Sequence, residues 1–208
     1  MAEPLRPFTS KLIPLLADNV DTDQIIPARY LKGTSKDGLG EGLFADWCYH
    51  GDGTPREGFV LNRPGMAGRA VLLAGANFGS GSSREHAAWA LRAFGVKAVL
   101  APVFADIFRN NALKNGLLPV ELPAEVHAEL AAAVEADPEA EVTVDLEAET
   151  VTLPGGRAVR FGVDPFARQM LLDGTDELGY LLAQGGLVAA YEDANPSRVD
   201  TTAPAWGG

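Results

Sequence analysis

The chain has 208 residues, 47% of them hydrophobic, and its 28 acidic and 17 basic side chains give a formal net charge of -11. This length and hydrophobicity suffice for one sizeable core, so we expect one domain over residues 1–191, followed by a flexible tail over 192–208 that is rich in Pro, Asp, Thr, Ala and Gly. The acidic balance argues against nucleic-acid binding, because that affinity depends on clustered Lys and Arg.

The N-terminal part predicts one strand and a polar loop. MAEPLRPFTS has no basic region followed by an apolar one, and no apolar run of the chain is long enough to span a bilayer, so we expect a cytoplasmic protein without membrane contact. Residues 11–16 (KLIPLL) are a short strand candidate, which Pro14 shifts towards a sheet edge or an irregular strand. The polar loop 18–24 (DNVDTDQ) follows, and residues 25–31 (IIPARYL) resume apolar character.

Residues 33–64 are rich in glycine and predict little regular structure. A stretch of this length is usually functional or partner-binding. It contains Cys48, the one cysteine of the sequence, beside Trp47, where a packed small side chain is expected. A single thiol excludes an internal disulfide framework, and it excludes an iron–sulfur cluster held by thiolates of this chain. Any such cluster must belong to a partner.

The centre of the chain predicts alternating strands and helices. Buried strands are expected at 70–76, 96–101 and 117–122, with helices at 84–94 and 104–115. A glycine-rich turn, NFGSGSS, joins the first of these strands to its helix, and Gly116 ends the second helix. This β-α-β-α-β order implies an α/β fold around a parallel sheet with right-handed crossovers.

The C-terminal half predicts one Ala/Glu-rich helix and a group of strands. The helix is expected at 124–136, and the strands at 141–146, 150–153 and 157–161, with Gly155 and Gly156 forming a hairpin turn. One or two short helices are expected between residues 165 and 191.

The strongest chemical signal is GSGSSREH, residues 79–86, where a buried strand turns into a helix. Ser82 and Glu85 have the S-x-x-E spacing of a capping box, so one interpretation is structural, with Ser82 or Ser83 capping the helix. The other interpretation is an anion site, because helix N-terminal N–H groups, two hydroxyls and Arg84 meet in one turn. An arginine can bind a carboxylate through two parallel hydrogen bonds.

Three other motifs do not fit this turn. A nucleotide P-loop needs a lysine that the turn lacks, and a dinucleotide fingerprint needs a third glycine where Arg84 stands. A serine-hydrolase elbow needs G-x-S-x-G, and its histidine arrives from a distant loop, whereas His86 lies on the same helix.

The motif and its surroundings resemble a known family. GSGSSREHA, preceded by LLAGANF, is similar to the signature of the aconitase swivel domain. DNVDTDQIIPARYL, APVFADIFRNNALKNGLLPV and DPFARQMLLDGTDELGYLL resemble 3-isopropylmalate dehydratase small subunits, and GLGEGLFADW with FVLN resembles their longer bacterial form. The resemblance covers most of residues 10–191, although Ser80 stands where relatives often carry Cys, Thr or Glu. It implies a layered β/β/α swivel-type domain around the parallel centre.

The resemblance also implies a reaction and a partner. In this family a [4Fe–4S] cluster on a large subunit acts as Lewis acid on the substrate hydroxyl, while a serine of the small subunit removes the neighbouring proton. Water is eliminated and then re-added, which interconverts 2-isopropylmalate and 3-isopropylmalate via 2-isopropylmaleate in leucine biosynthesis. The expected partner is the 3-isopropylmalate dehydratase large subunit, and the substrate is a small dicarboxylate. This chain is expected to hold no cofactor or metal of its own and to act as a hydro-lyase only in the heterodimer.

The family roles transfer to five residues of this sequence. Ser82 is the expected base, and Ser83 and Arg84 are expected to bind the substrate carboxylate, although the sequence leaves open which serine loses the proton. Positive potential from Arg84 and the helix N-terminus would assist that loss. Asp23 matches the family aspartate that helps complete the active site, whereas the residues alone favour an Asx turn or a helix cap there. Arg29 is a candidate second carboxylate ligand or an ordinary surface arginine.

Other polar residues are expected to have lesser roles. Residues 30–34 are expected to recognise the variable group of the substrate. His86 is expected in the core or in a supporting position, and His50 and His127 at the surface. Residues 109–111 (RNN) are expected either to close a loop near the site or to end a helix.

Two alternative functions stay open. The small subunit of a homoaconitase or citraconate-type hydro-lyase would retain Ser82 and Arg84 and differ around residues 30–34. A non-catalytic, anion-binding module would retain the swivel fold but would not need Ser82 for turnover.

Overall fold

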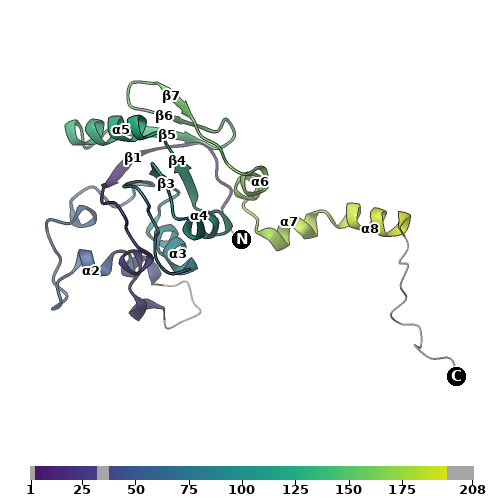
Figure 1. The fold of residues 1–208 in the computed structure, drawn as a ribbon, viewed down its shortest axis with the longest axis horizontal. Coiled ribbons are helices and arrows are strands. Elements are labelled where there is room, and N and C mark those ends of the chain that lie inside the picture. Colours follow the sequence, from purple (N-terminus) through teal and green to yellow (C-terminus); the bar gives the residue numbers. More distant parts are fainter. Residues whose placement is uncertain (1–2, 32–37, 196–208) are drawn as a thin grey trace.

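The computed structural model describes residues 3–31 and 38–195, which form one seven-stranded sheet with helices on both faces (Figure 1). The order of the strands is β4-β3-β2-β1-β5-β6-β7. The strands are β1 Phe8–Leu15, β2 Val71–Ala74, β3 Ala98–Ala101, β4 Leu118–Glu121, β5 Glu141–Asp145, β6 Thr150–Thr152 and β7 Ala158–Arg160. The α-helices are α1 Thr22–Ile25, α2 Ala45–Cys48, α3 Glu85–Phe94, α4 Asp106–Lys114, α5 Ala124–Ala136, α6 Pro165–Asp173, α7 Glu177–Ala183 and α8 Gly185–Ala194.

The parallel half of the sheet confirms the predicted β-α-β-α-β centre. Strand β2 pairs in parallel with β3, and β3 with β4, while α3 and α4 form the two crossovers. Every residue of β2 and of β3 is buried, as a parallel strand that is covered on both faces requires. The predicted strands and helices therefore lie where the sequence placed them, to within a few residues at their ends.

Strand β1 is the central strand of the sheet, and this places Pro14 differently from the prediction of an edge or irregular strand. The first half of β1 pairs antiparallel with β5, over Phe8–Lys11, and the second half pairs in parallel with β2, over Leu12–Leu15. Pro14 thus lies beyond the ladder to β5, where β1 has a strand on one side only. A residue without an N–H group is tolerated there because only one ladder has to be satisfied.

The antiparallel half completes a layered arrangement. The hairpin of β6 and β7 turns at Gly155 and Gly156, which have φ of 92° and 91°, so the predicted turn is confirmed. Helix α5 lies along these strands in Figure 1. Valines of β5 and β6 share one buried cluster with the apolar face of α5 and with Val71 and Leu73 of the parallel strands.

The opposite face of the parallel strands packs against α3, α4 and the irregular segment that follows β1. The described part of this segment contains α2 and three short 3-10 helices, at Ala28–Tyr30, Leu39–Gly42 and Val60–Asn62. Its aromatic side chains form a small core, since the rings of Phe44 and Trp47 stack 5.6 Å apart and Phe59 meets both edge-on. The segment therefore follows the predicted lack of long elements, but it is held by packing.

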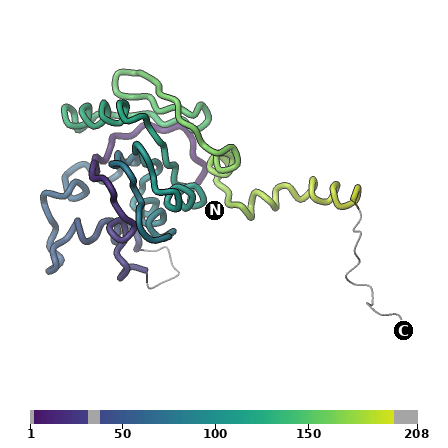
Figure 2. Tube along the Cα trace, in the orientation of Figure 1, coloured from purple at the N-terminus to yellow at the C-terminus, as the bar shows by residue number. Residues whose placement is uncertain are grey.

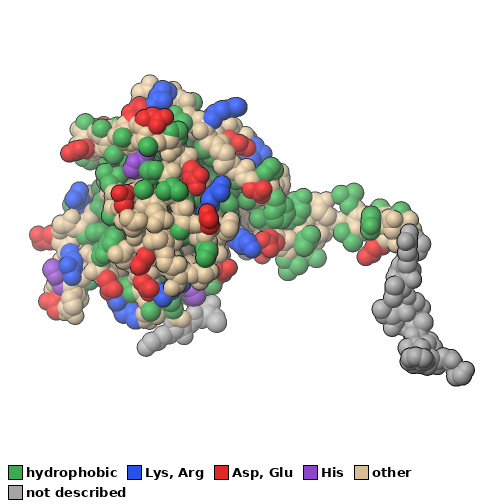
Figure 3. Space-filling view, viewed as in Figure 1, with side chains coloured by type: hydrophobic (Ala, Val, Ile, Leu, Met, Phe, Trp, Pro, Cys, Tyr) green, Lys and Arg blue, Asp and Glu red, His purple; other side chains and the backbone are tan. Residues whose placement is uncertain are grey.

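Three helices end the described chain, where one or two were predicted. Gly174, with a φ of 65°, ends α6, and Asp176 caps the start of α7 through the backbone N–H of Gly179. Helices α7 and α8 extend away from the body of the molecule (Figure 2), and hydrophobic side chains are visible along them (Figure 3). Helix α8 continues to Ala194, and residues 196–208 of the predicted tail lie outside the described residues. In the described ranges no helix combines the length and the apolar character needed to cross a membrane.

Candidate active site

Two loops that follow neighbouring parallel strands form the centre of the candidate site. The loop after β1 and the glycine-serine turn after β2 leave the same end of the sheet, where binding sites of α/β proteins usually form. Their backbones are joined by hydrogen bonds: Gly79 N and Ser80 N both donate to Val20 O, at 2.8 and 3.1 Å, and Thr22 N donates to Ser80 O at 2.8 Å. The sequence brings these loops together through pairing of β1 with β2.

Gly79 is required by the close packing beneath this turn. Its φ is 79°, and a Cβ atom built on it would lie 2.2 Å from Cγ of Phe108. Phe108 is a fully buried residue of α4, and its ring meets that of Phe78 edge-on at 5.2 Å. The turn therefore rests on α4, and any side chain at residue 79 would displace it.

Ser82 is held through its backbone, and its side chain is left free. The hydroxyl of Thr22, a residue that is 1% exposed, donates to Ser82 O at 2.9 Å. Ser82 and Ser83 are both exposed, and neither hydroxyl forms a hydrogen bond within the described part of the chain. Thr22 was not among the predicted site residues, because its position between two aspartates draws attention to the carboxylates.

The predicted capping box of Ser82 and Glu85 does not form. Helix α3 begins at Glu85, its N-cap is Arg84 in an extended conformation, and no side chain caps it. The hydrogen bond from Thr22 fixes the chain at Ser82, so the helix starts too late for either serine to reach its N–H groups. A capping box is present instead at α1, where Asp21 Oδ1 accepts from Gln24 N and Gln24 Oε1 accepts from Asp21 N, each at 2.9 Å.

Asp23 and Arg84 are brought together as an ion pair between Oδ1 and Nη1. The Arg84 side chain is 20% exposed and the Asp23 side chain 51%. Only Nη1 of the guanidinium is engaged among the described contacts, so donors on Nη2 and Nε remain for a ligand. Two of the predicted site residues thus meet directly beside the turn that carries Ser82 and Ser83.

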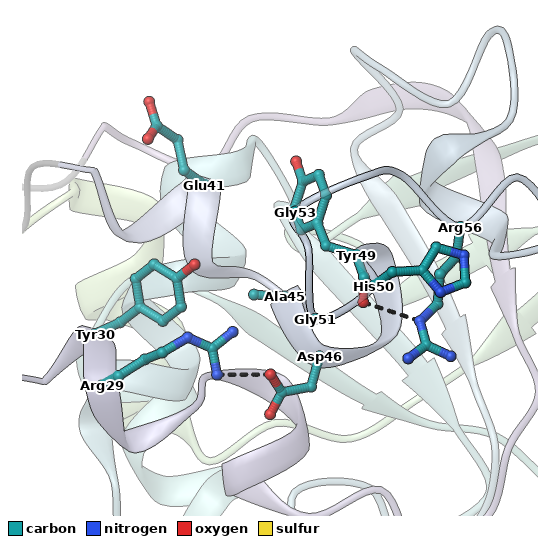
Figure 4. Close-up of a pocket in the computed structure, with 10 residues that line it drawn as sticks. All are labelled: Arg29, Tyr30, Glu41, Ala45, Asp46, Tyr49, His50, Gly51, Gly53 and Arg56. Carbon is teal, nitrogen blue, oxygen red and sulfur yellow. Dashed lines mark hydrogen bonds and ion pairs between the residues drawn. The ribbon is translucent and has the colours of Figure 1, made fainter.

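Arg29 lies in a separate pocket of about 770 Å³ (Figure 4). Its Nη1 pairs with Asp46 Oδ1 at 2.6 Å, and its guanidinium lies 4.9 Å from the centre of the Tyr30 ring. The hydrogen bond that Arg29 donates to Asp46 raises the pKa of Arg29 above its usual value. No hydrogen bond or ion pair of the described residues joins Arg29 to the serine turn, residues 79–83. Lys32 and Thr34 of the predicted recognition loop lie outside the described residues.

The three histidines differ in how closely their observed positions match the predicted ones. His50 is exposed, as predicted. His86 is half-buried, with its ring 4.6 Å from that of Trp89, and its supporting role stays a prediction. The prediction for His127 is wrong, because its Nε2 is hydrogen-bonded to Ala74 O, the last residue of β2, at 2.7 Å. Its helical spacing of three and seven residues to Leu130 and Val134, which are buried, could have indicated this inward position.

Residues 109–111 lie inside α4 and do not end it. Arg109 Nε pairs with Glu121 Oε1 at 3.9 Å on the outer side of this helix. The amide nitrogen of Asn111 is buried, and it has no hydrogen-bond partner among the described residues. Neither residue forms a hydrogen bond or an ion pair with the turn of Ser82 and Ser83 among the described contacts, so this run lies outside the candidate site.

Cys48 is a packed core residue, as predicted. It is 5% exposed, its Sγ lies 3.5 Å from Leu43 O, and burial raises the pKa of its thiol to about 11. Over the described ranges, no group of three or more His, Cys, Asp or Glu side chains is arranged to hold a metal ion. The donors that the structure describes in this chain therefore do not fit an iron–sulfur cluster.

Comparison with known proteins places these features in a family. Residues 6–125 match the family described as Aconitase C-terminal domain, and residues 128–165 match the family model LeuD_N. The chain is 54% identical over 201 residues to the 3-isopropylmalate dehydratase small subunit of Roseiflexus sp. (strain RS-1), covering 97% of this chain and 98% of that protein. It is 60% identical over 190 residues to the protein of the same name from Anaeromyxobacter sp. (strain K), covering 91% and 97%. The crystal structure of a 3-isopropylmalate dehydratase (leuD) from Methanocaldococcus jannaschii superposes with a TM-score of 0.64 at 26% identity, covering 89% of this chain and 99% of that one.

Proposed function

Because the chain belongs to the family of 3-isopropylmalate dehydratase small subunits, we propose that it supplies the base and the carboxylate-binding half of a hydro-lyase active site. Together with a large subunit it interconverts 2-isopropylmalate and 3-isopropylmalate by removal and re-addition of water. The observation that carries this proposal is the convergence of Asp23, Arg84 and the free hydroxyls of Ser82 and Ser83 at one end of the parallel strands.

The large subunit supplies the other half of the site, including the iron–sulfur cluster. The single thiol of the sequence, Cys48, supports this division, because one thiolate is too few to hold such a cluster. When bound to the large subunit, the cluster provides a Lewis acid for the substrate hydroxyl.

Ser82 acts as the base of the elimination. Its backbone is fixed by Thr22, whereas its hydroxyl is exposed and free to meet a substrate. Ser82 first gives its Oγ proton to solvent water, to which it is exposed, and the resulting alkoxide accepts the proton from the substrate carbon. The C–H electrons form the carbon–carbon double bond, and the hydroxyl on the adjacent carbon leaves as hydroxide. The positive end of the α3 dipole and the charge of Arg84 stabilise the serine alkoxide by electrostatic attraction, without a hydrogen bond from the helix to Ser82.

Arg84 and Ser83 bind a substrate carboxylate next to the base. Asp23 holds one guanidinium nitrogen and so fixes the orientation of Arg84, which leaves the other N–H donors for a two-point contact with the substrate. Arg29 binds the second carboxylate from the neighbouring pocket. This last assignment requires Asp46 to release or share the guanidinium, because the two are paired at 2.6 Å.

The test compares Ser82→Ala with its neighbour Ser83→Ala, each assembled with the cognate large subunit. Ser82→Ala is expected to lower kcat by a factor of about 10³ or more with the complex intact, because the proton acceptor is removed. Ser83→Ala is expected to raise KM and to lower kcat much less. Complex formation is measured by gel filtration, so that loss of turnover is separated from loss of assembly.

Two results would contradict the proposal. Unchanged turnover of Ser82→Ala would favour a non-catalytic module, and a larger loss in Ser83→Ala would assign the base to Ser83. Parallel assays with 3-isopropylmalate, citrate, homocitrate and citraconate identify the substrate, and a preference for one of the last three would exclude the isopropylmalate reaction.

A further inference from the structure

The described chain ends in an apolar helical arm, which we define as residues 177–194, formed by α7 and α8. Six of its large hydrophobic side chains are between 48% and 72% exposed. They are Leu178, Leu181, Leu182, Leu187, Val188 and Tyr191. The arm projects from the body in Figure 2, and its hydrophobic side chains face solvent in Figure 3. A soluble chain that exposes this many neighbouring apolar side chains normally covers them with another protein surface.

The arm is anchored at its base, so it leaves the body in a defined direction. The ring of Tyr180 meets that of Phe166 on α6 edge-on at 4.8 Å. Glu177 pairs with Lys114, the last residue of α4, at 3.1 Å. Beyond these contacts the apolar side chains of α8 are exposed along the whole helix, and none of its residues is buried.

The charges of the arm indicate what kind of surface covers it. Acidic side chains stand at both ends, Asp176 and Glu177 at the start and Glu192 and Asp193 at the finish, and residues 169–197 contain no Lys, Arg or His. Antiparallel pairing with a second copy would bring these acidic ends against each other, and the net charge of -11 on each chain would add to the repulsion. The fitting partner therefore offers an apolar groove with basic residues at its rim.

Helix α4 connects the arm to the candidate active site. Phe108 of α4 supports the serine turn at Gly79, and Lys114 at the other end of α4 pairs with the arm. Two further exposed hydrophobic side chains, Val103 and Ile107, lie before and within this same helix. A second protein that covers the serine turn thus meets α4, and from α4 it can continue onto the arm.

We propose that the apolar face of the arm docks into a basic-rimmed groove on the large, cluster-bearing subunit, and that the arm is a main source of affinity for that subunit. The identity of this partner rests on the proposed function, which requires a large subunit. The arm acts in assembly only, since it contributes no side chain to the serine turn in the described contacts.

The test uses the full chain and its cognate large subunit, and measures their Kd by isothermal titration calorimetry. The arm variant combines Leu178→Gln, Leu182→Gln and Leu187→Gln, which keep a helix-forming side chain and remove the apolar contact. The matched control is Leu16→Gln, because Leu16 is 46% exposed and lies outside the arm. A charge variant combines Glu192→Gln and Asp193→Asn. Circular dichroism of each free variant reports its folding.

The arm variant is expected to raise the Kd at least tenfold, and the control to change it less than twofold. The charge variant is expected to weaken binding at low salt and to reduce its dependence on salt. Excess large subunit restores turnover to the arm variant, whereas Ser82→Ala binds normally without turnover, so failure of the docking and failure of the reaction are distinguishable.

A Kd of the arm variant equal to that of the unmodified chain overturns the proposal. Arm-dependent dimerisation of the free chain in sedimentation equilibrium also overturns it, because a second copy would then be the occupant.

Discussion

The hydroxyl of Thr22 donates a hydrogen bond to the carbonyl oxygen of Ser82, although the two residues lie 60 positions apart in the chain. Thr22 is buried and Ser82 is exposed, so the contact anchors an exposed turn to the rigid interior. It determines where α3 begins and leaves the serine side chain without a structural partner. Thr22 therefore positions the proposed base without touching the substrate.

Thr22→Val removes this hydrogen bond with almost no change in shape. We expect a loss of about 1–2 kcal/mol in the free energy of unfolding, because Ser82 O loses its partner. We also expect kcat of the assembled enzyme to fall about tenfold or more, with KM less affected. Urea unfolding and steady-state kinetics measure the two effects. Thr22→Ser retains the hydroxyl and should recover most of the kcat; a Ser variant as slow as the Val variant would show that the methyl group matters instead.

Asp23→Asn tests whether the ion pair of Asp23 with Arg84 orients the Arg84 side chain more than it stabilises the fold. The pair is partly exposed, so its loss should cost no more than about 0.5 kcal/mol of stability. KM should rise about tenfold, because Arg84 loses the group that orients it. The control is Glu129→Gln, which breaks a pair with Arg157 in which the carboxylate is 50% exposed, against 51% for Asp23. Equal effects of the two variants on KM would contradict the proposed role of Asp23.

Gly79→Ala is expected to destabilise the protein by at least about 3 kcal/mol, because it combines a positive φ with a clash against Phe108. Gly155→Ala provides a matched comparison, since Gly155 has a φ of 92° but open space around its Cβ position. That variant should lose only about 1 kcal/mol, the conformational part of the effect. Chemical denaturation of both measures the difference, and similar losses would mean that Phe108 moves aside.

Burial of Cys48 predicts a slow reaction with alkylating reagents. Its thiol pKa is raised from 9.0 to about 11, so at pH 8 the thiolate is about 100-fold less populated than in the unfolded chain. Iodoacetamide should modify the folded protein at least 100-fold more slowly than the protein in urea. Since the raised pKa favours the neutral thiol, this contribution to stability is fully present below pH 9 and is lost as the pH rises through 11. Cys48→Ala should lack that alkaline loss; rapid alkylation at pH 8 would contradict the burial.

The parallel centre of the fold could be predicted because its signals are local. Continuous apolar runs, a glycine turn and helical periodicity placed β2, α3, β3, α4 and β4, and Gly155 with Gly156 placed a hairpin. The partners of β1 could not be predicted, because its two halves pair with strands on opposite sides. His127 was misplaced for a related reason, since its partner is a carbonyl group 53 residues away.

The sequence by itself determined the residue types at the site, the family, and the need for a partner to carry any cluster, because these follow from a contiguous motif and from a single cysteine. The tertiary structure alone decided which of these residues meet. It joined Asp23 to Arg84 across 61 positions, and it replaced the expected serine cap by the bond from Thr22 to Ser82. The reason is physical: a capping box is a preference within four residues, and a hydrogen bond from the buried Thr22 of a neighbouring loop overrides it here.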